Sequence, residues 1–370
     1  MSTAVSIIAF ILIIGILIFF HEFGHFLLAK RNGVGVVEFS IGMGPKLFSR
    51  VKNGTNFCVR AIPFGGYCMM LGDESFVPDP SLEGEKVDMD EDHAYSKKSV
   101  WARMSITLAG PVFNFILGFI FSVILIALVG VTTTKISGTV ENSAAEEAGL
   151  QAGDEILKLN RTRVHQFKDI SIYMSLHEGE EITVTYRRDG EKMTAVIKPK
   201  IDEETGAYLI GIYAPQRTKD LNVLQVFRYG FYDFEYNAGA VIKSLGLLFR
   251  GKLGLNDLSG PVGMAGMVND IVTEVEEDTK EESFFVTAFW VFVNLLNFAS
   301  LISVNLGIMN LLPVPGLDGG KFLFLLVEAV IRRPVPKKME GIITIAGFVL
   351  LFGLMIVVFF NDVIKVFFRA

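Results

Sequence analysis

The sequence has very little cysteine and no cluster of basic residues. Its 370 residues include only two cysteines, Cys58 and Cys68, so no disulfide framework is expected. The net charge of −6 comes without a basic block, which argues against nucleic acid as a partner. No internal repeat with a period of about 20–50 residues is evident, so nothing indicates a repeat architecture.

Long apolar runs dominate the sequence instead. Hydrophobic residues make up 51% of the chain and charged residues 20%, with a mean hydropathy of +0.45, a combination that is rare in soluble domains. Four segments approach the roughly 20 residues that a helix needs to cross a bilayer. They run from Ala4 to Phe20 (continuing apolar to Ala29), Ile106 to Val131, Phe284 to Leu312 and Ile342 to Phe360. We therefore predict a polytopic α-helical membrane protein with four transmembrane helices.

The first apolar run has an alternative interpretation as a cleaved signal peptide. It lacks the basic n-region and the small-residue cleavage site of such peptides, and its far end carries a metal-ligand motif. We therefore expect it to be a membrane span.

Lysine and arginine near the span ends predict the topology. Basic residues follow the first span, precede the second and lie between the third and fourth, whereas the segment from Glu274 to Glu282 is strongly acidic. This pattern places residues 30–105 and 328–340 in the cytoplasm, and both termini and residues 132–283 outside.

Two regions between the spans differ from them in composition. The Gly-rich region from Arg31 to Gly72 indicates short strands and turns. The stretch from about Lys135 to Pro215 mixes short strands with two short helices, at 144–148 and 167–176, as expected of one small α+β domain. We therefore divide the chain into residues 1–131 with the first two spans, a small domain at 132–217, an interfacial amphipathic linker at 218–283 and the last two spans at 284–370.

An HExxH motif, His21-Glu22-Phe23-Gly24-His25, lies at the end of the first span. Residues four apart share one face of a helix, so both imidazoles can bind one zinc ion. Glu22 is then placed to accept a proton from the attacking water, the general-base role of this motif in metalloproteases. Such polar residues are costly inside a membrane unless they face protein, so we predict a zinc site here.

A catalytic zinc ion needs a third protein ligand. His93, His165 and His177 are candidates by residue type, but all three are expected at the surface. Asp318 follows the third span in the segment 310–320, where two prolines and three glycines must break the helix. The alternative role for Asp318 is that of a helix-capping carboxylate at the membrane face.

Depth in the membrane favours Asp318 as the third ligand. The first and third spans are predicted to run from outside to inside, so His21, His25 and Asp318 all lie near the cytoplasmic face. The second span runs the other way, so Pro111 and Asn114 near its cytoplasmic beginning lie at the same depth. Polar features of three separate spans therefore converge, which a random scatter of polar residues would not favour.

Together these motifs resemble the site-2 protease family of intramembrane zinc metalloproteases. The resemblance rests on HExxH in the first span, on the Asn-x-x-Pro-x-Pro-x-Leu-Asp-Gly element of residues 310–319, and on the small domain between them. That domain is similar to the PDZ domains of bacterial proteases through its segment 148–154. Residues 109–114 and 260–263 fit the same family, so the resemblance covers nearly the whole chain.

The resemblance implies a set of site residues. A zinc ion is expected on His21, His25 and Asp318, with Glu22 activating water. Two further groups are expected to hold an unwound substrate beside the metal, one after the third span and one in a membrane-associated β-hairpin. These groups are Asn310, Pro313 and Pro315, and Gly65, Gly66 and Tyr67.

The resemblance also implies an enzymatic activity and a cellular localisation. The expected reaction is hydrolysis of peptide bonds in single-span membrane proteins, such as anti-sigma factors or signal-peptide remnants, in the bacterial cytoplasmic membrane. The lipid bilayer is then a partner, and one extracytoplasmic PDZ-like domain is expected to bind or filter substrate ectodomains.

The sequence departs from the commonest family pattern in two places. Lys321 stands where many relatives have histidine, which puts any role of that position around the metal in doubt. The chain has room for one PDZ-like domain, whereas some relatives have two.

Two other functions are considered. The first is a non-proteolytic scaffold that binds protein tails, but such a function does not explain why the predicted ligands lie at one depth. A zinc transporter needs further His or Asp ligands along the spans, and the second and fourth spans supply none.

Overall fold

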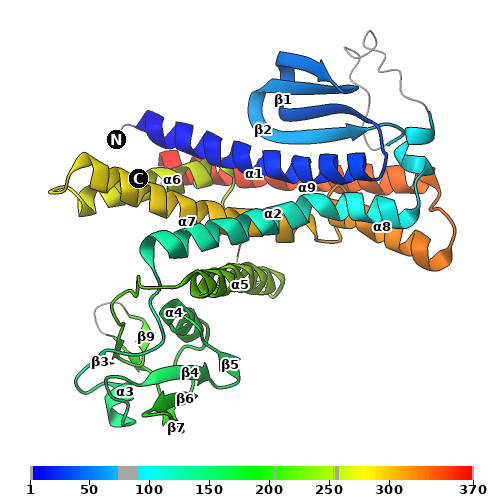
Figure 1. The fold of residues 1–370 in the computed structure, drawn as a ribbon. Coiled ribbons are helices and arrows are strands. Elements are labelled where there is room, and N and C mark those ends of the chain that lie inside the picture. The colour runs from blue at the N-terminus through cyan, green and yellow to red at the C-terminus, as the bar shows by residue number, and fades with distance from the viewer. Residues whose placement is uncertain (1–2, 74–90, 203–205, 253, 255–257, 369–370) are drawn as a thin grey trace. The chain divides into compact units, whose positions relative to one another are not determined.

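The computed structural model describes residues 3–73, 91–202, 206–252, 254 and 258–368. The chain forms two compact units, one made of residues 1–121 with 237–370 and the other of residues 122–236. The first unit holds most of the long apolar helices and a β-hairpin, and the second holds the short strands (Figure 1).

Four helices in the described part of the chain are long and apolar enough to cross a membrane. They are α1 (Thr3–Arg31), α2 (Val100–Val129), α7 (Phe284–Asn310) and α9 (Lys337–Phe368). In Figure 1 they run alongside one another, and the start of α1 lies at the same end as the end of α9. Large apolar side chains are exposed on them, such as Ile345 and Phe348 of α9, which are 66% and 63% exposed. The four predicted spans are therefore confirmed as helices with lipid-compatible surfaces.

The Gly-rich region between α1 and α2 forms two long bent strands in place of the short strands that we expected. β1 (Val36–Lys52) and β2 (Thr55–Met70) pair in antiparallel orientation. Glu38 of β1 pairs with residues in both halves of β2, so the hairpin folds back on itself. Gly42 and Gly44 have φ angles of 84° and 80°, a region that favours glycine, and they lie where β1 bends.

The helix break predicted after the third span is present. α7 ends at Asn310, and α8 (Asp318–Ile331) begins at Asp318. Pro313 and Pro315 lie between them, and Gly316 has a φ of 97°. Proline lacks the backbone N–H that an interior helical position donates, so two prolines close together with Gly316 favour a break here, and the new helix starts after them. Asp318 thereby becomes the first residue of α8.

The remaining elements of the first unit are short helices and one helix of intermediate length. They are η2 (Glu91–His93), η3 (Tyr95–Lys97) and α6 (Pro261–Asp278), and α5 (Val223–Phe249) extends from the second unit into the first. α6 packs on α1, where its Val268 joins Phe10 and Ile14 in one buried cluster.

The second unit is rich in β-strands. Its largest sheet is antiparallel, in the order β5 (Thr162–Arg163), β4 (Glu155–Leu159), β6 (Ile182–Arg188) and β7 (Glu191–Ile197). Two small sheets pair β3 (Gly138–Thr139) with β10 (Ile212–Tyr213), and β8 (Lys200–Ile201) with β9 (Tyr208–Leu209). The two predicted short helices are present as α3 (Ala144–Glu147) and α4 (Phe167–Leu176). The boundaries at residues 132, 218 and 284 stay predictions.

A buried ion pair closes the turn before β4. The side chain of Asp154 is 1% exposed, and the Arg188 guanidinium donates to both of its carboxylate oxygens at 2.8 Å. The backbone N–H of Gln151 donates to the same carboxylate at 2.9 Å. Burial alone would raise the pKa of Asp154, but these donors outweigh it and hold that pKa below its usual range.

This pair makes the stability of the second unit dependent on pH. A carboxyl group whose folded pKa is depressed stabilises the fold above its unfolded pKa of about 4, and loses that effect as the pH falls through the folded pKa. We expect Arg188→Met to lower the unfolding temperature at pH 7. Below about pH 4 the unfolding temperature of this variant should fall less steeply with pH than that of the wild type. Thermal unfolding followed by circular dichroism checks this, and equal pH dependence in variant and wild type would contradict it.

Candidate metal centre

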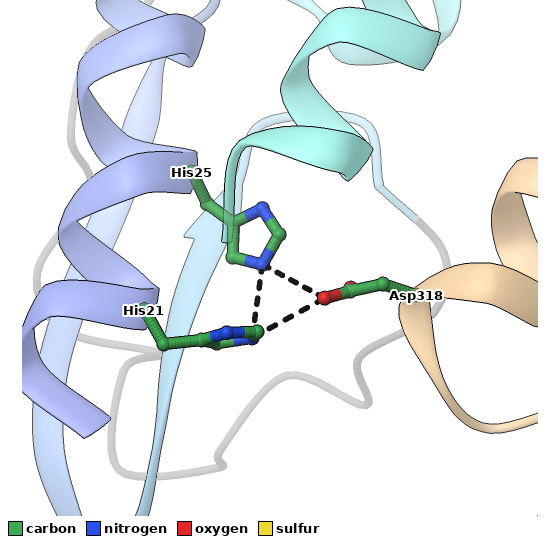
Figure 2. Close-up of side chains that lie close together, drawn as sticks. All are labelled: His21, His25 and Asp318. Carbon is green, nitrogen blue, oxygen red and sulfur yellow. Dashed lines mark hydrogen bonds and ion pairs between the residues drawn. The ribbon is translucent and has the colours of Figure 1, made fainter. Parts of the chain in front are cut away.

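The two histidines of the HExxH motif lie on one face of α1. Their ring centroids are 4.9 Å apart, and the ring planes cross at 85°. The Nε2 atoms of His21 and His25 are 3.3 Å apart (Figure 2). The two imidazoles thus converge on one point, as the spacing of four residues predicts.

Asp318 reaches the same point from the start of α8. Its Oδ2 lies 3.2 Å from Nε2 of His21 and 3.3 Å from Nε2 of His25. Figure 2 shows the carboxylate facing both rings. In the described part of the chain this is the one group of three His, Cys, Asp or Glu side chains whose ligand atoms all lie within 4.8 Å of one another. We call these three residues the converging group.

The hydrogen bonding of His25 and Asp318 indicates which kind of ligand the converging group can bind. Its Nδ1–H donates to the carbonyl of Ile106 in α2 at 2.8 Å, so Nε2 of the neutral ring is an acceptor. Oδ2 of Asp318 is a buried oxygen that accepts no hydrogen bond from any described residue. Acceptor atoms that face one another repel unless a cation lies between them, so the residues present fit a metal ion.

His21 has its own partner on α2. The amide nitrogen of Asn114 lies 3.1 Å from Nδ1 of His21, while the buried amide oxygen accepts no hydrogen bond from a described residue. Rotating the side-chain amide of Asn114 by about 180° exchanges its oxygen and nitrogen and satisfies both groups, because Nδ1–H of His21 then donates to the Asn114 oxygen. Ser303 of α7 donates to the Asn114 carbonyl at 2.7 Å and holds this part of α2. The sequence predicts that Asn114 lies near the two histidines, as this contact has it, but it does not predict these hydrogen-bond partners.

Two glycines let α1 and α2 approach closely enough for these contacts. A Cβ atom at Gly24 would lie 2.5 Å from the carbonyl oxygen of Ala109. A Cβ atom at Gly110 would lie 2.4 Å from Nε2 of His25 and 2.7 Å from Cε1 of His21. The space beside the imidazoles is therefore kept free by a missing side chain on α2. The sequence contains these glycines but does not show which helix they face.

Glu22 lies between the converging group and the hairpin. A Cβ atom at Gly66 of β2 would lie 3.1 Å from Cγ of Glu22, so the strand runs directly past this side chain. The backbone N–H of Cys68, also in β2, donates to the Glu22 carboxylate. Its carboxylate is thus fixed between the predicted ligands and a strand.

The other hairpin candidates have different surroundings. Gly65 has a φ of 81°, which favours glycine at that turn of the strand. The hydroxyl of Tyr67 donates to Glu38 at 2.6 Å, and Arg60 donates to the same buried carboxylate at 2.7 Å. Burial alone would raise the pKa of Glu38, but the bonds from Tyr67 and Arg60 outweigh it and lower that pKa. The Tyr67 hydroxyl therefore holds the hairpin together.

Asn310, Pro313 and Pro315 lie on the path from α7 to Asp318. Asn310 is half-buried at the end of α7, Pro313 is exposed and Pro315 is half-buried. Gly347 of α9 packs on this segment, since a Cβ atom there would lie 2.1 Å from the Pro315 carbonyl oxygen. The segment between α7 and α8 therefore packs against α9. The substrate-binding role of Asn310, Pro313 and Pro315 stays a prediction.

The other three histidines have different partners. His93 ends η2 and is exposed. His165 stacks on Tyr232 with ring centroids 3.9 Å apart, and His177 stacks on Tyr173 at 4.1 Å. None of the three belongs to the converging group.

Comparison with known proteins shows the family. The model of peptidase family M50 matches residues 9–354, a range that includes both the HExxH motif and Asp318. This chain belongs to peptidase family M50. Its membership confirms the resemblance to site-2 proteases, and it identifies the chain as a peptidase.

Several curated relatives match this M50 chain over nearly their whole length. A Clostridium acetobutylicum protein named as a zinc metalloprotease is 36% identical over 97% of both chains. The zinc metalloprotease RasP of Bacillus licheniformis is 32% identical over 98% of this chain and 99% of its own. The regulator of sigma-W protease RasP of Bacillus subtilis is 30% identical with the same coverage.

Among solved structures, the PDZ domain of an SdrC-like protein from Listeria monocytogenes is 23% identical to this M50 chain. It covers 23% of this chain and 86% of its own, with a TM-score of 0.19. A score this low carries no argument about the fold, so the PDZ-like character of the second unit stays a prediction.

Proposed function

We propose that this M50 peptidase is an intramembrane zinc metalloprotease that hydrolyses peptide bonds of single-span membrane proteins. The observation that carries the proposal is the convergence of two imidazole nitrogens and one carboxylate oxygen beside Glu22. Helices apolar enough to cross a membrane bring these groups together. The relatives that are named zinc metalloproteases support the same reaction.

The proposed zinc ligands are His21, His25 and Asp318. Two nitrogens and one carboxylate oxygen match a known ligand set of catalytic zinc sites, which keep a fourth position open. A zinc ion in such a site activates water and polarises the scissile carbonyl. Ile106 and Asn114 bond the Nδ1 atoms of the two rings, and these bonds orient both Nε2 atoms toward the metal position.

Glu22 is the proposed general base. Its carboxylate takes a proton from the attacking water and delivers it to the leaving amine. The hydrogen bond from the Cys68 backbone keeps the carboxylate at the side of β2. A peptide bond held along β2 would therefore lie within reach of Glu22.

The substrate is proposed to bind in an extended form. A helical substrate hides its peptide bonds in its own hydrogen bonds, so the segment to be cut must unwind first. A strand can pair with the unwound segment and hold it open. The proposed contacts are Gly65, Gly66 and Tyr67 on the hairpin, and Asn310, Pro313 and Pro315 on the segment before α8. The position of Gly66 beside Glu22 supports the hairpin part of this proposal.

The proposed substrates are anti-sigma factors and signal-peptide remnants in the bacterial cytoplasmic membrane. The name of the Bacillus subtilis relative, a regulator of sigma-W protease, supports the first class. Both termini and residues 132–217 are proposed to lie outside the cytoplasm. There the PDZ-like domain would bind or filter substrate ectodomains.

Zinc content and cleavage together test this function. Purified protein in detergent should hold about one zinc ion per chain and cut a tagged single-span anti-sigma factor or signal-peptide remnant. A chelator should stop cleavage, and added zinc should restore it. Absence of stoichiometric zinc would favour a tail-binding scaffold, and bound zinc without cleavage of either substrate would contradict the proposed substrate class.

A further inference from the structure

The first turn of α8 carries a second charged side chain besides Asp318. Lys321 lies three residues further along, on the same side of the helix. Its Nζ donates to Oδ2 of Asp73 at 2.7 Å, and the two side chains are 23% and 4% exposed. Lys321 thus joins α8 to the chain segment that leaves the hairpin.

Asp73 is held firmly to the end of β2. Its backbone N–H donates to the Met70 carbonyl at 3.2 Å. The Leu71 N–H donates to the Gly35 carbonyl at 2.8 Å, and the Tyr95 N–H donates to the Leu71 carbonyl at 2.7 Å. The same strand, only a few residues earlier, carries the contacts with Glu22. A displacement of Asp73 is therefore transmitted to the part of β2 that runs past the proposed general base.

Tyr95 connects the same ammonium group to α2. Nζ of Lys321 lies 4.6 Å from the centroid of the Tyr95 ring, a cation–π contact. The Tyr95 hydroxyl lies 3.2 Å from Oγ1 of Thr107 in α2. Thr107 follows Ile106, whose carbonyl accepts the hydrogen bond of His25. Lys321 therefore links three elements that border the metal centre.

We propose that Lys321 is a positioning residue that sets the distance between β2 and Asp318. The inference rests on the proposed protease function, in which the substrate lies along β2 and the metal is held partly by Asp318. The ion pair with Asp73 joins these two elements directly. Misplacement by roughly 1 Å can lower an enzyme's rate about 100-fold, so loss of the pair should affect catalysis much more than zinc binding.

A second ion pair of α8 supplies a matched control. Arg103 of α2 pairs with Glu328 near the other end of α8, and their side chains are 16% and 18% exposed. This pair is similarly buried and also fastens α8, but it does not involve the hairpin. Arg103→Met should therefore weaken the packing of α8 without changing the path of β2.

The test measures cleavage kinetics, cleavage positions and zinc content of the full chain with a tagged single-span substrate. Lys321→Met should lower kcat/KM about 100-fold and allow cuts at neighbouring peptide bonds, which mass spectrometry detects. Asp73→Asn should act in the same direction, and the energetic effects of the two substitutions should be less than additive in the double variant, because both remove the same ion pair. Lys321→Arg should restore the wild-type cleavage position. Zinc content should stay near that of the wild type.

Hydrogen exchange gives a readout that needs no activity. Backbone amides of residues 66–73 should exchange faster in Lys321→Met but not in Arg103→Met. Unchanged cleavage positions, with an activity loss equal to that of Arg103→Met, would overturn the proposal, because Lys321 would then only stabilise the fold. Loss of zinc in Lys321→Met would overturn it as well. A wild type that binds zinc but cuts no substrate would count against the proposed function instead.

Discussion

Glu22→Gln is expected to stop proteolysis while the zinc site stays filled. Glutamine has the size of glutamate and can still accept the hydrogen bond from the Cys68 backbone. It cannot take a proton from water, and general-base catalysis contributes about 10²–10⁴-fold to a reaction rate. The three proposed ligands are untouched, so zinc content should equal that of the wild type.

The measurement is cleavage of a tagged single-span substrate in detergent, with zinc quantified in the same samples. The control is Glu155→Gln, because Glu155 forms only an exposed ion pair with Arg187 on the second unit. This variant should cleave the substrate at the wild-type rate. Equal cleavage by Glu22→Gln and the wild type would show that Glu22 is not the base. Loss of zinc in Glu22→Gln would mean that this side chain takes part in metal binding.

The parts of this site that follow from local backbone geometry were predictable from the sequence. The helical repeat places His21 and His25 on one face in any uninterrupted helix. Pro313 and Pro315, two residues apart and followed by Gly316, strongly disfavour a continuous helix, so the position of Asp318 after a break followed from the sequence as well. These features depend on a few neighbouring residues, and the structure has all of them.

The contacts between elements were not predictable in the same way. Nothing in the sequence pairs the amide of Asn114 with His21, or shows that Gly110 faces the imidazoles. The length and bend of the hairpin strands depend on tertiary pairing, in which Glu38 meets both halves of β2. Lys321 shows the same limit, because its departure from the family pattern was visible but its partner Asp73 was not.

These contacts explain how distant segments form one site. The residues that orient the imidazoles lie on α2, and the proposed third ligand lies on α8, so the site depends on how closely these helices approach α1. Small side chains determine that approach, since Gly24 and Gly110 allow contacts that any side chain would prevent. The metal centre should therefore be sensitive to substitutions that change no ligand.

Gly110→Ala is the sharpest case of this sensitivity, and we expect it to remove zinc and activity together. The new methyl group would lie 2.4 Å from Nε2 of His25 and 2.7 Å from the ring of His21. Neither ring can simply move aside, because Ile106 and Asn114 bond their Nδ1 atoms. Zinc–ligand distances tolerate changes of only about 0.2 Å, so zinc affinity should fall more than about 100-fold.

Gly118→Ala is the matched control on the same helix. Its methyl group would lie 2.7 Å from Cγ2 of Val304, a comparable overlap with no predicted ligand nearby. Both variants should be destabilised by about 1–3 kcal/mol through overpacking, which thermal unfolding in detergent measures. Zinc retained after dialysis against a competing chelator should separate them, with loss in Gly110→Ala alone. Equal retention would show that the two imidazoles beside Gly110 do not hold the metal, because a methyl group in contact with both rings cannot leave a zinc site intact.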